Sequence, residues 1–370
     1  MRYKRMPIEI ESPEQMGYDT IKNNLSESSF TDVVFGDLGL DLKGLILAYG
    51  SHAGHEALRE LIAIESKTLT KDDVLLTVGA AAGLFIMATS LLKKKDELVV
   101  MRPNYATNIE TPLAIGASPT YLDLRFEDGF RLDRKALRKA VTKKTRYISV
   151  THPHNPTGVC LSDGDMKELV AIAEEKDTWL LVDETYRDMV FGKKLPPACD
   201  YSEKVISISS LSKSYGLPGI RVGWILCRNK RLMETFLAAK EQIHICGSSL
   251  DEEVAWQTLR QREQHFAPIM KEIREKFVIM KNWMEGQKGL EWVEPQGGVV
   301  CFPRIKNPRK VDIDRFYKIL LGKYGTYTGP GHWFDMPRHY MRIGFGWPSK
   351  GQLADGLDAI GKSLEEARRK

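Results

Sequence analysis

The sequence predicts an α/β fold, in which helices sandwich a mostly parallel sheet and a smaller α+β domain follows. Two observations predict it. Short apolar stretches alternate with amphipathic helical stretches through the middle of the chain, as in parallel sheets covered on both faces. After about residue 250 this alternation gives way to a long charged helical stretch and then to short mixed elements. A chain of 370 residues is also too long to fold around one small hydrophobic core, which favours a large domain with a smaller one.

The alternation is clearest between residues 74 and 213. A strand that ends at Gly79 is expected to run directly into a helix of small residues. Further strands are predicted at 96–103, 118–124, 145–153, 178–184 and 204–213, with helices at 106–116, 134–142 and 162–176. Sheets of this kind bind ligands beyond the carboxyl ends of their strands. We therefore look for a site there.

Three parts of the chain are expected. Residues 1–45 are predicted to pack with the small domain, residues 46–255 to form the large domain, and residues 256–370 to form the small α+β domain. The change in character near residue 250 and the short elements that follow it are the basis of this division.

The composition favours a protein that binds neither nucleic acid nor membranes. The net charge of +5 is modest, and the sequence contains no basic block and no zinc-ligand spacing. No secretory signal begins the chain, and its apolar runs are shorter than a membrane span. The five cysteines form no CxxC pair, which predicts reduced thiols and a cytoplasmic location.

Several polar residues fall at the ends of predicted strands. Each has an ordinary explanation on its own, because an Asp at a strand end is often a turn residue and "GAAAG" often means close helix packing. Together, however, these residues are typical of one kind of binding site. They are Asn155 in "HNPTG", Asp183 and Tyr186 in "VDETY", and Ser210 and Lys213 in "SLSK".

This set of residues matches the needs of pyridoxal 5'-phosphate. Lys213 at a strand end can form a Schiff base with the cofactor's aldehyde. A buried Asp183 would keep the pyridine nitrogen protonated, so that the ring can act as an electron sink. Asn155 and Tyr186 could donate hydrogen bonds to the ring's phenolic oxygen.

The cofactor's phosphate requires backbone N–H groups and a fixed cation. The helix that begins in "GAAAG" offers the N–H groups of Ala80 and Ala81. Arg221 offers a permanent bidentate partner, and the Ser210 hydroxyl offers another donor. No carboxylate or thiol accompanies His52, His55, His152 or His154 at metal-ligand spacing, so no metal site is predicted. His52 and His55 are instead candidates for substrate contact across a dimer interface.

In these motifs the sequence resembles the fold-type I pyridoxal-phosphate enzymes, specifically the class I/II aminotransferases. The matching residues occur in order over most of the chain, from about Tyr49 onward. They are Asn155-Pro156-Thr157-Gly158, Asp183 with Tyr186, Ser210 to Lys213 with Arg221, and "YMRIGFG" with Arg342.

The resemblance implies further roles. Tyr105 would stack on the pyridine ring. Tyr49 would reach the phosphate of the neighbouring subunit, which implies a homodimer with shared active sites. Arg342 would clamp the substrate's α-carboxylate, and Asn155 would also contact the substrate. The segment 328–334 resembles the loop where the small domain approaches the site.

The implied activity is amino-group transfer between an amino acid and a 2-oxo acid. Lys213 would be the general base, with its pKa lowered by cationic surroundings, and Asp183 and Tyr186 would complete the catalytic set. Two features depart from the family pattern. Ala81 stands where many relatives carry a hydroxyl, and the Ser/Glu-rich segment 24–42 lacks the usual substrate-capping pattern.

That segment and "PHNPTG" are similar to a subgroup that includes capreomycidine synthase. The similarity implies an alternative reaction, in which a pyridoxal-phosphate lyase or cyclase acts on a substituted amino acid by elimination and addition. Two other classes fit less well. A transcriptional regulator on this fold would carry a DNA-binding domain before Tyr49, and a nucleotide-binding enzyme would need a glycine-rich phosphate loop after its first strand.

Overall fold

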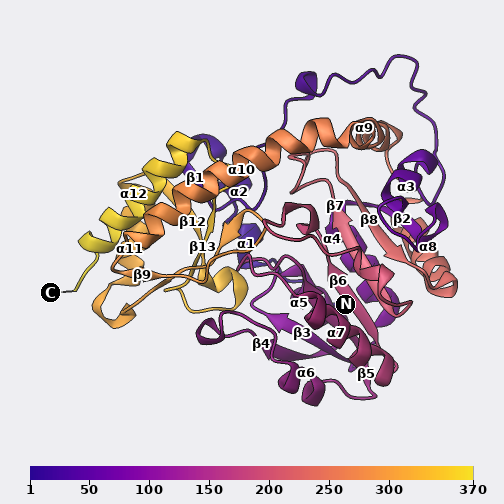
Figure 1. Ribbon diagram of the computed structural model, residues 1–370, viewed down its shortest axis with the longest axis horizontal. Coiled ribbons are helices and arrows are strands. Elements are labelled where there is room, and N and C mark those ends of the chain that lie inside the picture. Colours follow the sequence, from indigo (N-terminus) through magenta and orange to yellow (C-terminus); the bar gives the residue numbers. More distant parts are fainter. Residues whose placement is uncertain (370) are drawn as a thin grey trace.

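A seven-stranded sheet forms the centre of the larger part of the molecule in the computed structural model, which describes residues 1–369 (Figure 1). Strand β8 runs antiparallel to its two neighbours, and the other neighbouring pairs are parallel. The mostly parallel sheet is therefore confirmed. In spatial order the strands are β2 (Val74–Val78), β8 (Val222–Cys227), β7 (Val205–Ser210), β6 (Trp179–Asp183), β5 (Thr145–Thr151), β3 (Glu97–Arg102) and β4 (Ser118–Asp123).

Helices cover both faces of this sheet. On β6, Leu180 and Val182 pack with Leu169 of α7, whereas Leu181 packs with Leu84 of α4 in a separate core on the other face. The alternation of side chains along a strand produces these two cores. The helices around the sheet are α3 (Glu56–Ala63), α4 (Gly79–Leu91), α5 (Thr107–Ile115), α6 (Arg134–Ala140), α7 (Asp163–Glu175) and α8 (Lys230–His244).

A smaller sheet lies at the other end of the molecule (Figure 1). Its first strand comes from the N-terminal segment and pairs in parallel with a strand about three hundred residues later, Asn23 opposite Thr326. The strand order is β1 (Asn23–Leu25), β12 (Thr326–Pro330), β13 (Met341–Gly344) and β10 (Val300–Cys301), and β9 (Leu290–Glu291) pairs with β11 (Arg304–Ile305). Helices α11 (Ile313–Gly322) and α12 (Lys350–Glu366) pack beside these strands. The division of the chain at residues 45 and 255 stays a prediction.

The long charged stretch after residue 250 forms two helices, α9 (Ser249–Arg260) and α10 (Arg262–Glu285). The backbone leaves helical geometry at Gln261, where φ is −108° and ψ is 27°. The two helices have different partners, because α9 packs against α3 and α10 against α12. Helix α10 thus extends from the large unit to the small one (Figure 1). No helix within residues 1–369 is long and apolar enough to span a membrane.

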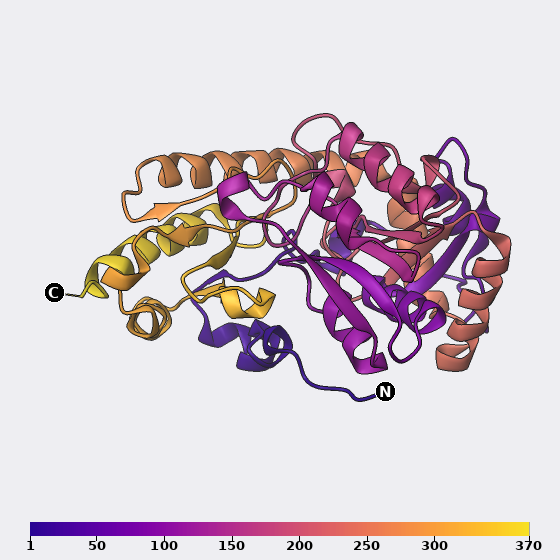
Figure 2. The ribbon, with the colours of Figure 1, turned by 90° about the horizontal axis from the view of Figure 1, so that it is seen from below.

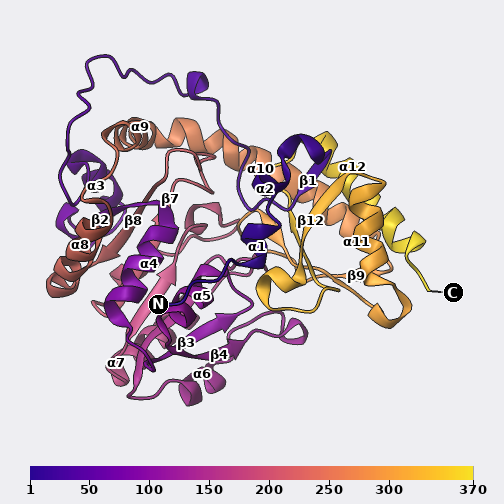
Figure 3. The same ribbon diagram turned by 180° about the vertical axis from the view of Figure 1, so that it is seen from behind.

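Two short helices at the start of the chain are α1 (Pro7–Ile10) and α2 (Pro13–Met16), and α1 packs beside the 3-10 helix η8 (Gly331–Phe334) of the small unit (Figure 2). Between β1 and α3 the chain then arches over α9 (Figure 3). The arch carries exposed apolar side chains, with Ile46, Leu47 and Tyr49 79%, 76% and 87% exposed.

The 3-10 helices are η1 (Tyr18–Thr20), η2 (Phe35–Leu38), η3 (Lys71–Asp73), η4 (Phe126–Asp128), η5 (Arg187–Met189), η6 (Ala198–Asp200), η7 (Pro308–Lys310) and η8 (Gly331–Phe334).

Candidate active site

One pocket collects nearly all of the residues that the sequence singled out. It lies at the carboxyl ends of β5, β6 and β7 and is closed by the N-terminal segment and the small unit. Predicted site residues that line it are Ala80, Ala81, Tyr105, Asn155, Asp183, Tyr186, Ser210, Lys213, Arg221 and Arg342. The predicted residue outside it is Tyr49, which lies on the exposed arch near His244 and Leu250.

The first turn of α4 provides an anion site at one end of the pocket. No side chain among residues 1–369 caps this helix, and its first turn contains no acidic residue. The N–H groups of Ala80 and Ala81 are therefore open to a ligand, and the helix dipole favours a negative charge there. Ser210 and Ser212 also line this end, where the Ser212 hydroxyl accepts a hydrogen bond from Arg221 Nη1 at 3.4 Å.

Arg221 is held close to this helix terminus by an unusual backbone. Its φ of +48° lies in the left-handed region, which costs a residue with a Cβ about 1 kcal/mol or more and is concentrated at functional sites. The Arg221 guanidinium occupies the space that a Cβ on Gly79 would need, and Nη2 is the atom that such a Cβ would meet first. A Cβ on Gly223 would lie 2.7 Å from the Ala80 nitrogen. Both glycines thus keep the cation and the helix terminus together.

Lys213 lines the centre of the pocket. Burial lowers the pKa of its amine, Glu27 raises it, and Arg342 and Arg221 lower it further. From the sequence alone, cationic surroundings are the expected cause of this shift. Desolvation is the larger cause, and the cations add to it. The backbone carbonyl of Lys213 accepts a hydrogen bond from the Phe30 N–H at 3.0 Å, which ties the lysine loop to the N-terminal segment.

Asp183 ends β6 as a buried carboxylate. Its Oδ1 accepts hydrogen bonds from the Thr185 hydroxyl at 2.6 Å and the Thr185 N–H at 3.1 Å. Burial raises the pKa of Asp183, while these hydrogen bonds lower it. A cationic N–H in the pocket would compensate this buried charge. Tyr105 also lines the pocket, where an aromatic face can stack on a planar ring.

Arg342 lies beside Asn155, deep in the pocket. Its Nη1 donates to Asn155 Oδ1 at 3.2 Å and its Nη2 donates to the Ser26 carbonyl at 2.6 Å, whereas its buried Nε has no partner among the described residues. The guanidinium carbon lies 5.0 Å from the Phe334 ring and 5.9 Å from the Trp333 ring. A buried guanidinium with an unused donor is suited to a carboxylate ligand.

The Tyr186 hydroxyl is directed elsewhere than the sequence analysis expected. It donates to the Ser28 carbonyl at 2.7 Å, so its proton is used to hold the N-terminal segment. The ring of Tyr186 still lines the pocket. A hydrogen bond from the Tyr186 hydroxyl to the cofactor stays a prediction, and it requires the hydroxyl to give up its bond to the Ser28 carbonyl.

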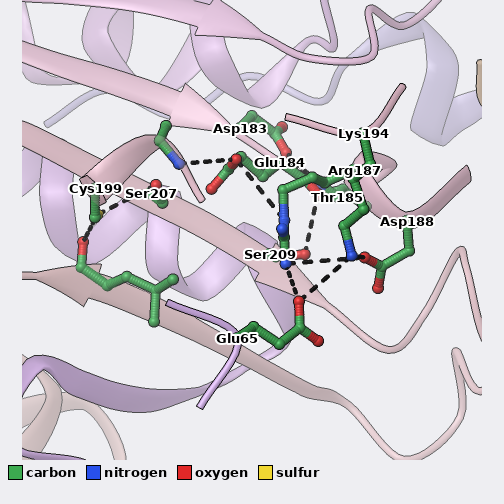
Figure 4. A network of polar contacts seen from close by, with 12 residues as sticks. Glu65, Asp183, Glu184, Thr185, Arg187, Asp188, Lys194, Cys199, Ser207 and Ser209 are labelled. Carbon is green, nitrogen blue, oxygen red and sulfur yellow. Dashed lines mark hydrogen bonds and ion pairs between the residues drawn. The ribbon is translucent and has the colours of Figure 1, made fainter. Parts of the chain in front are cut away.

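A network of charges supports the turn that carries Asp183 (Figure 4). Arg187 in η5 pairs with Glu65, and its Nε lies 3.9 Å from the buried carboxylate of Glu184. Glu184 also accepts a hydrogen bond from the Ala198 N–H at 3.1 Å. Arg262, at the start of α10, pairs with Asp188 at 2.7 Å. The network therefore fastens α10 to the loop after β6.

The N-terminal segment contributes pocket residues that the sequence analysis did not identify. Ser26, Glu27 and Ser28 follow β1 directly and line the pocket with Glu9 and Glu14. Tyr18 donates to Glu27 Oε1 at 3.2 Å. Burial raises the pKa of Glu27, and Lys213 and Arg342 lower it. The Ser/Glu-rich composition of 24–42 was visible in the sequence, but its place in the pocket follows from the pairing of β1 with β12.

The four histidines lie outside the pocket lining. His152 and His154 are buried, and burial lowers the pKa of each to about 4, so both are neutral. His52 Nδ1 lies 2.6 Å from Glu241 Oε1, and His55 caps α3 by accepting from the Leu58 N–H. Within residues 1–369 no three His, Cys, Asp or Glu side chains are grouped to hold a metal ion.

The pocket residues fit pyridoxal 5'-phosphate. The uncapped helix terminus with Arg221 matches a phosphate, and the cradle has room because Gly79 and Gly223 lack a Cβ. Asp183 matches a protonated ring nitrogen, and Lys213 is an amine without a hydrogen-bonded partner among the described residues.

Comparisons with known proteins agree with this fit. Residues 29–360 match the family model for aminotransferases of class I and II. Capreomycidine synthase of Streptomyces vinaceus is 31% identical over 360 residues, which cover 94% of this chain and 91% of that protein. A PLP-dependent aminotransferase from Streptococcus suis superposes with a TM-score of 0.91 at 24% identity and full coverage of both chains. The PLP-dependent cyclase OrfR superposes with a TM-score of 0.89 at 26% identity, covering 99% of this chain and 98% of that one.

Proposed function

This chain belongs to the aminotransferase family of class I and II, and we propose that it moves an amino group between an amino acid and a 2-oxo acid. Its cofactor is pyridoxal 5'-phosphate. The observation that carries the proposal is the meeting of Lys213, Asp183, Arg221 and Arg342 in one pocket. Each of these residues is suited to bind or react with a different chemical group of the cofactor or of an amino acid.

The residues proposed to hold the cofactor come from the large unit. The N–H groups of Ala80 and Ala81, with Ser210 and Arg221, bind its phosphate. Asp183 holds a proton on the ring nitrogen, and Tyr105 packs on the ring face. When bound, the cofactor supplies an aldehyde for the amino group and a ring that accepts electrons from Cα.

The residues proposed to act on the amino acid are Arg342, Asn155 and Lys213. Arg342 binds the α-carboxylate, and Asn155 fixes the guanidinium by accepting from Nη1. This contact orients Cα toward Lys213. The Lys213 amine would take the proton from Cα and donate it to the carbon that carries the cofactor's aldehyde, and its lowered pKa permits the first step because more of the amine is neutral. Burial of the pocket by the N-terminal segment excludes water from the reacting atoms.

The charges of the pocket favour an amino acid with a positively charged side chain. Its cations are Lys213, Arg221 and Arg342, and each has a task at the cofactor or the α-carboxylate. The wall formed by the N-terminal segment instead carries Glu9, Glu14 and Glu27, and these three carboxylates make no ion pair within residues 1–369. A guanidinium or ammonium group on the substrate would supply the missing countercharge.

We also propose a homodimer in which Tyr49 reaches the phosphate site of the partner subunit. The exposed arch supports this proposal, because Ile46, Leu47 and Tyr49 leave a large apolar surface open to solvent. The arch begins beside the pocket, where the Val33 N–H donates to the Gly216 carbonyl at 2.9 Å. A second copy that covers the arch would bring Tyr49 close to its own pocket.

A second candidate reaction uses the same site. The identity of 31% to capreomycidine synthase and the TM-score of 0.89 to the cyclase OrfR favour a lyase or cyclase that acts on a substituted amino acid. In that reaction Lys213 takes the same proton from Cα, but a substituent on Cβ then leaves. The residues that bind the cofactor and the α-carboxylate keep their roles.

The experiment that tests the proposal separates the two half-reactions. The cofactor-loaded protein is incubated with single amino acids and no 2-oxo acid, and the products are quantified by mass spectrometry. An aminotransferase yields one 2-oxo acid per site and stops, and a 2-oxo acid added after removal of the donor becomes an amino acid. Continuous formation of a cyclic or dehydrated product would instead establish the lyase or cyclase reaction. The Lys213→Ala variant is the control for both.

A further inference from the structure

A single carboxylate joins the start of the chain to the pocket wall beside Arg342. Glu11 follows α1 directly and accepts a hydrogen bond from Trp333 Nε1 at 2.7 Å. The same carboxylate lies 3.0 Å from His332 Nε2. Both partners belong to η8, more than three hundred residues further along the chain. Glu11 is also held through its backbone, since its carbonyl accepts a hydrogen bond from the Tyr327 hydroxyl at 2.8 Å.

Both segments that Glu11 joins form walls of the pocket. On one side, Ile8, Ser12 and Pro13 of the α1–α2 segment line it. On the other side, Trp333 lines it and is 3% exposed. Glu11 itself does not line the pocket, and its side chain is 41% exposed. Any effect of Glu11 on the site must therefore pass through these neighbours.

The position of Trp333 matters because its ring lies next to Arg342. The guanidinium carbon of Arg342 is 5.9 Å from the ring centroid, and Gly329 on β12 leaves space for the indole, since a Cβ there would lie 3.0 Å from Trp333 Cε3. A shifted indole would move the guanidinium or open it to water. Either change weakens a carboxylate contact that depends on burial.

We infer that Glu11 is a positioning residue, which holds Trp333 against Arg342 and the α1–α2 segment over the pocket so that the amino acid is bound tightly. The inference rests on the proposed function in so far as the ligand of Arg342 is an amino acid. It assigns no contact between Glu11 and the substrate or the cofactor. The cofactor is bound by the large unit, so Glu11 acts on the affinity for the amino acid and not for the cofactor.

The test compares Glu11→Ala with Gln15→Ala, an exposed position on the same segment with no side-chain hydrogen bond among the described contacts. Amino-acid affinity is measured on the cofactor-loaded protein by titration of the visible absorbance, with the amino acid that the wild type binds best. A hydrogen bond to a charged acceptor is worth about 10- to 100-fold in affinity, so Glu11→Ala is expected to raise the dissociation constant within that range. Gln15→Ala should match the wild type.

A second readout does not depend on activity. Hydrogen–deuterium exchange should become faster in residues 7–16 and in residues 328–334 together in Glu11→Ala, with the exchange of β5 to β7 unchanged. The cofactor's dissociation constant should also stay unchanged. Trp333→Phe keeps a ring but lacks the N–H, so Glu11→Ala in that background should cost less than in the wild type.

Two results would overturn the inference. One is an amino-acid affinity of Glu11→Ala equal to that of Gln15→Ala. The other is a joint loss of amino-acid affinity, cofactor affinity and melting temperature, which would make Glu11 a general stability residue. Failure of the proposed function is recognised separately, because the wild type itself would then bind no amino acid.

Discussion

The Arg342 guanidinium donates from Nη1 to the side-chain Oδ1 of Asn155 at 3.2 Å, although the two residues come from different units of the molecule. Asn155 follows β5 of the central sheet, and Arg342 lies on β13 of the small one. The contact sets the small unit against the strand ends of the large unit. The Arg342 Nε, which has no hydrogen-bond partner within residues 1–369, is left for a ligand.

Arg342→Lys should weaken amino-acid binding without releasing the cofactor. Lysine keeps the charge but cannot form two parallel hydrogen bonds to a carboxylate. We expect the dissociation constant for an amino acid to rise by about 10- to 100-fold. The matched control is the decarboxylated amine of the same amino acid, whose affinity should be equal in wild type and variant. An equal loss for both ligands would contradict the carboxylate role of Arg342.

Asp183→Asn should retain the cofactor and lose activity. The variant keeps the size of the side chain but removes the charge that compensates a protonated ring nitrogen. We expect the turnover number to fall by at least about 100-fold, as for other groups that hold a proton in the transition state. Thr185→Val removes only the hydroxyl that donates to Asp183 at 2.6 Å, and it should cause a smaller loss. Full activity in Asp183→Asn would remove Asp183 from the catalytic set.

The pKa of Lys213 can be read from the rate at which the cofactor-free protein captures pyridoxal 5'-phosphate. Capture requires the neutral amine, and burial lowers the Lys213 pKa, so the midpoint of the rate against pH should lie below that of an ordinary lysine amine. Two neighbouring charged residues shift the Lys213 pKa in opposite directions. Glu27 raises this pKa, so Glu27→Gln should move the midpoint to lower pH, and Arg342→Gln should move it to higher pH. The measurement is stopped-flow absorbance between pH 6 and 11, and shifts in the same direction would contradict the electrostatic account.

The fold and the centre of the site could be predicted because they depend on local patterns. Apolar stretches bounded by turns located the strands; Asp183 ends β6, and Lys213 lies in the turn that follows the end of β7 at Ser210. The acidic wall of the pocket, formed by Glu9, Glu14 and Glu27, could not be predicted, because Glu27 reaches the pocket through the pairing of β1 with β12. The division between α9 and α10 was also missed, because Gln261 is an ordinary helix former and the change of packing partner is tertiary.

Tyr49 should affect the cofactor only across a dimer interface. In one chain its side chain is 87% exposed and lies apart from the pocket, so Tyr49→Phe removes a hydroxyl that contributes nothing to that chain's own site. We expect a homodimer by light scattering and an increase of the cofactor's dissociation constant by about 3- to 10-fold in Tyr49→Phe. Charged substitutions at Ile46 and Leu47 should dissociate the dimer. A monomer with full cofactor affinity would contradict the shared site.

The acidic wall should select for charge on the substrate side chain. Glu27 is the most enclosed of its carboxylates, and a substrate cation beside it would replace the countercharge of Lys213 and Arg342 once these have bound the cofactor and the α-carboxylate. Arginine and citrulline have the same shape and differ in this charge. We expect the wild type to bind arginine about 10- to 100-fold more tightly than citrulline, the range for a hydrogen bond to a charged group.

Glu27→Gln isolates the cause of that preference. The amide keeps the shape and one acceptor of Glu27 but removes its charge, so arginine should lose most of its advantage while citrulline binds as before. Glu234→Gln, an exposed carboxylate on α8 outside the pocket, is the control and should leave both affinities unchanged. Lysine and norleucine form a second matched pair with the same expectation. If citrulline or glutamate binds the wild type as tightly as arginine, the substrate is not chosen by charge, and the wall serves only to set the pKa of Lys213.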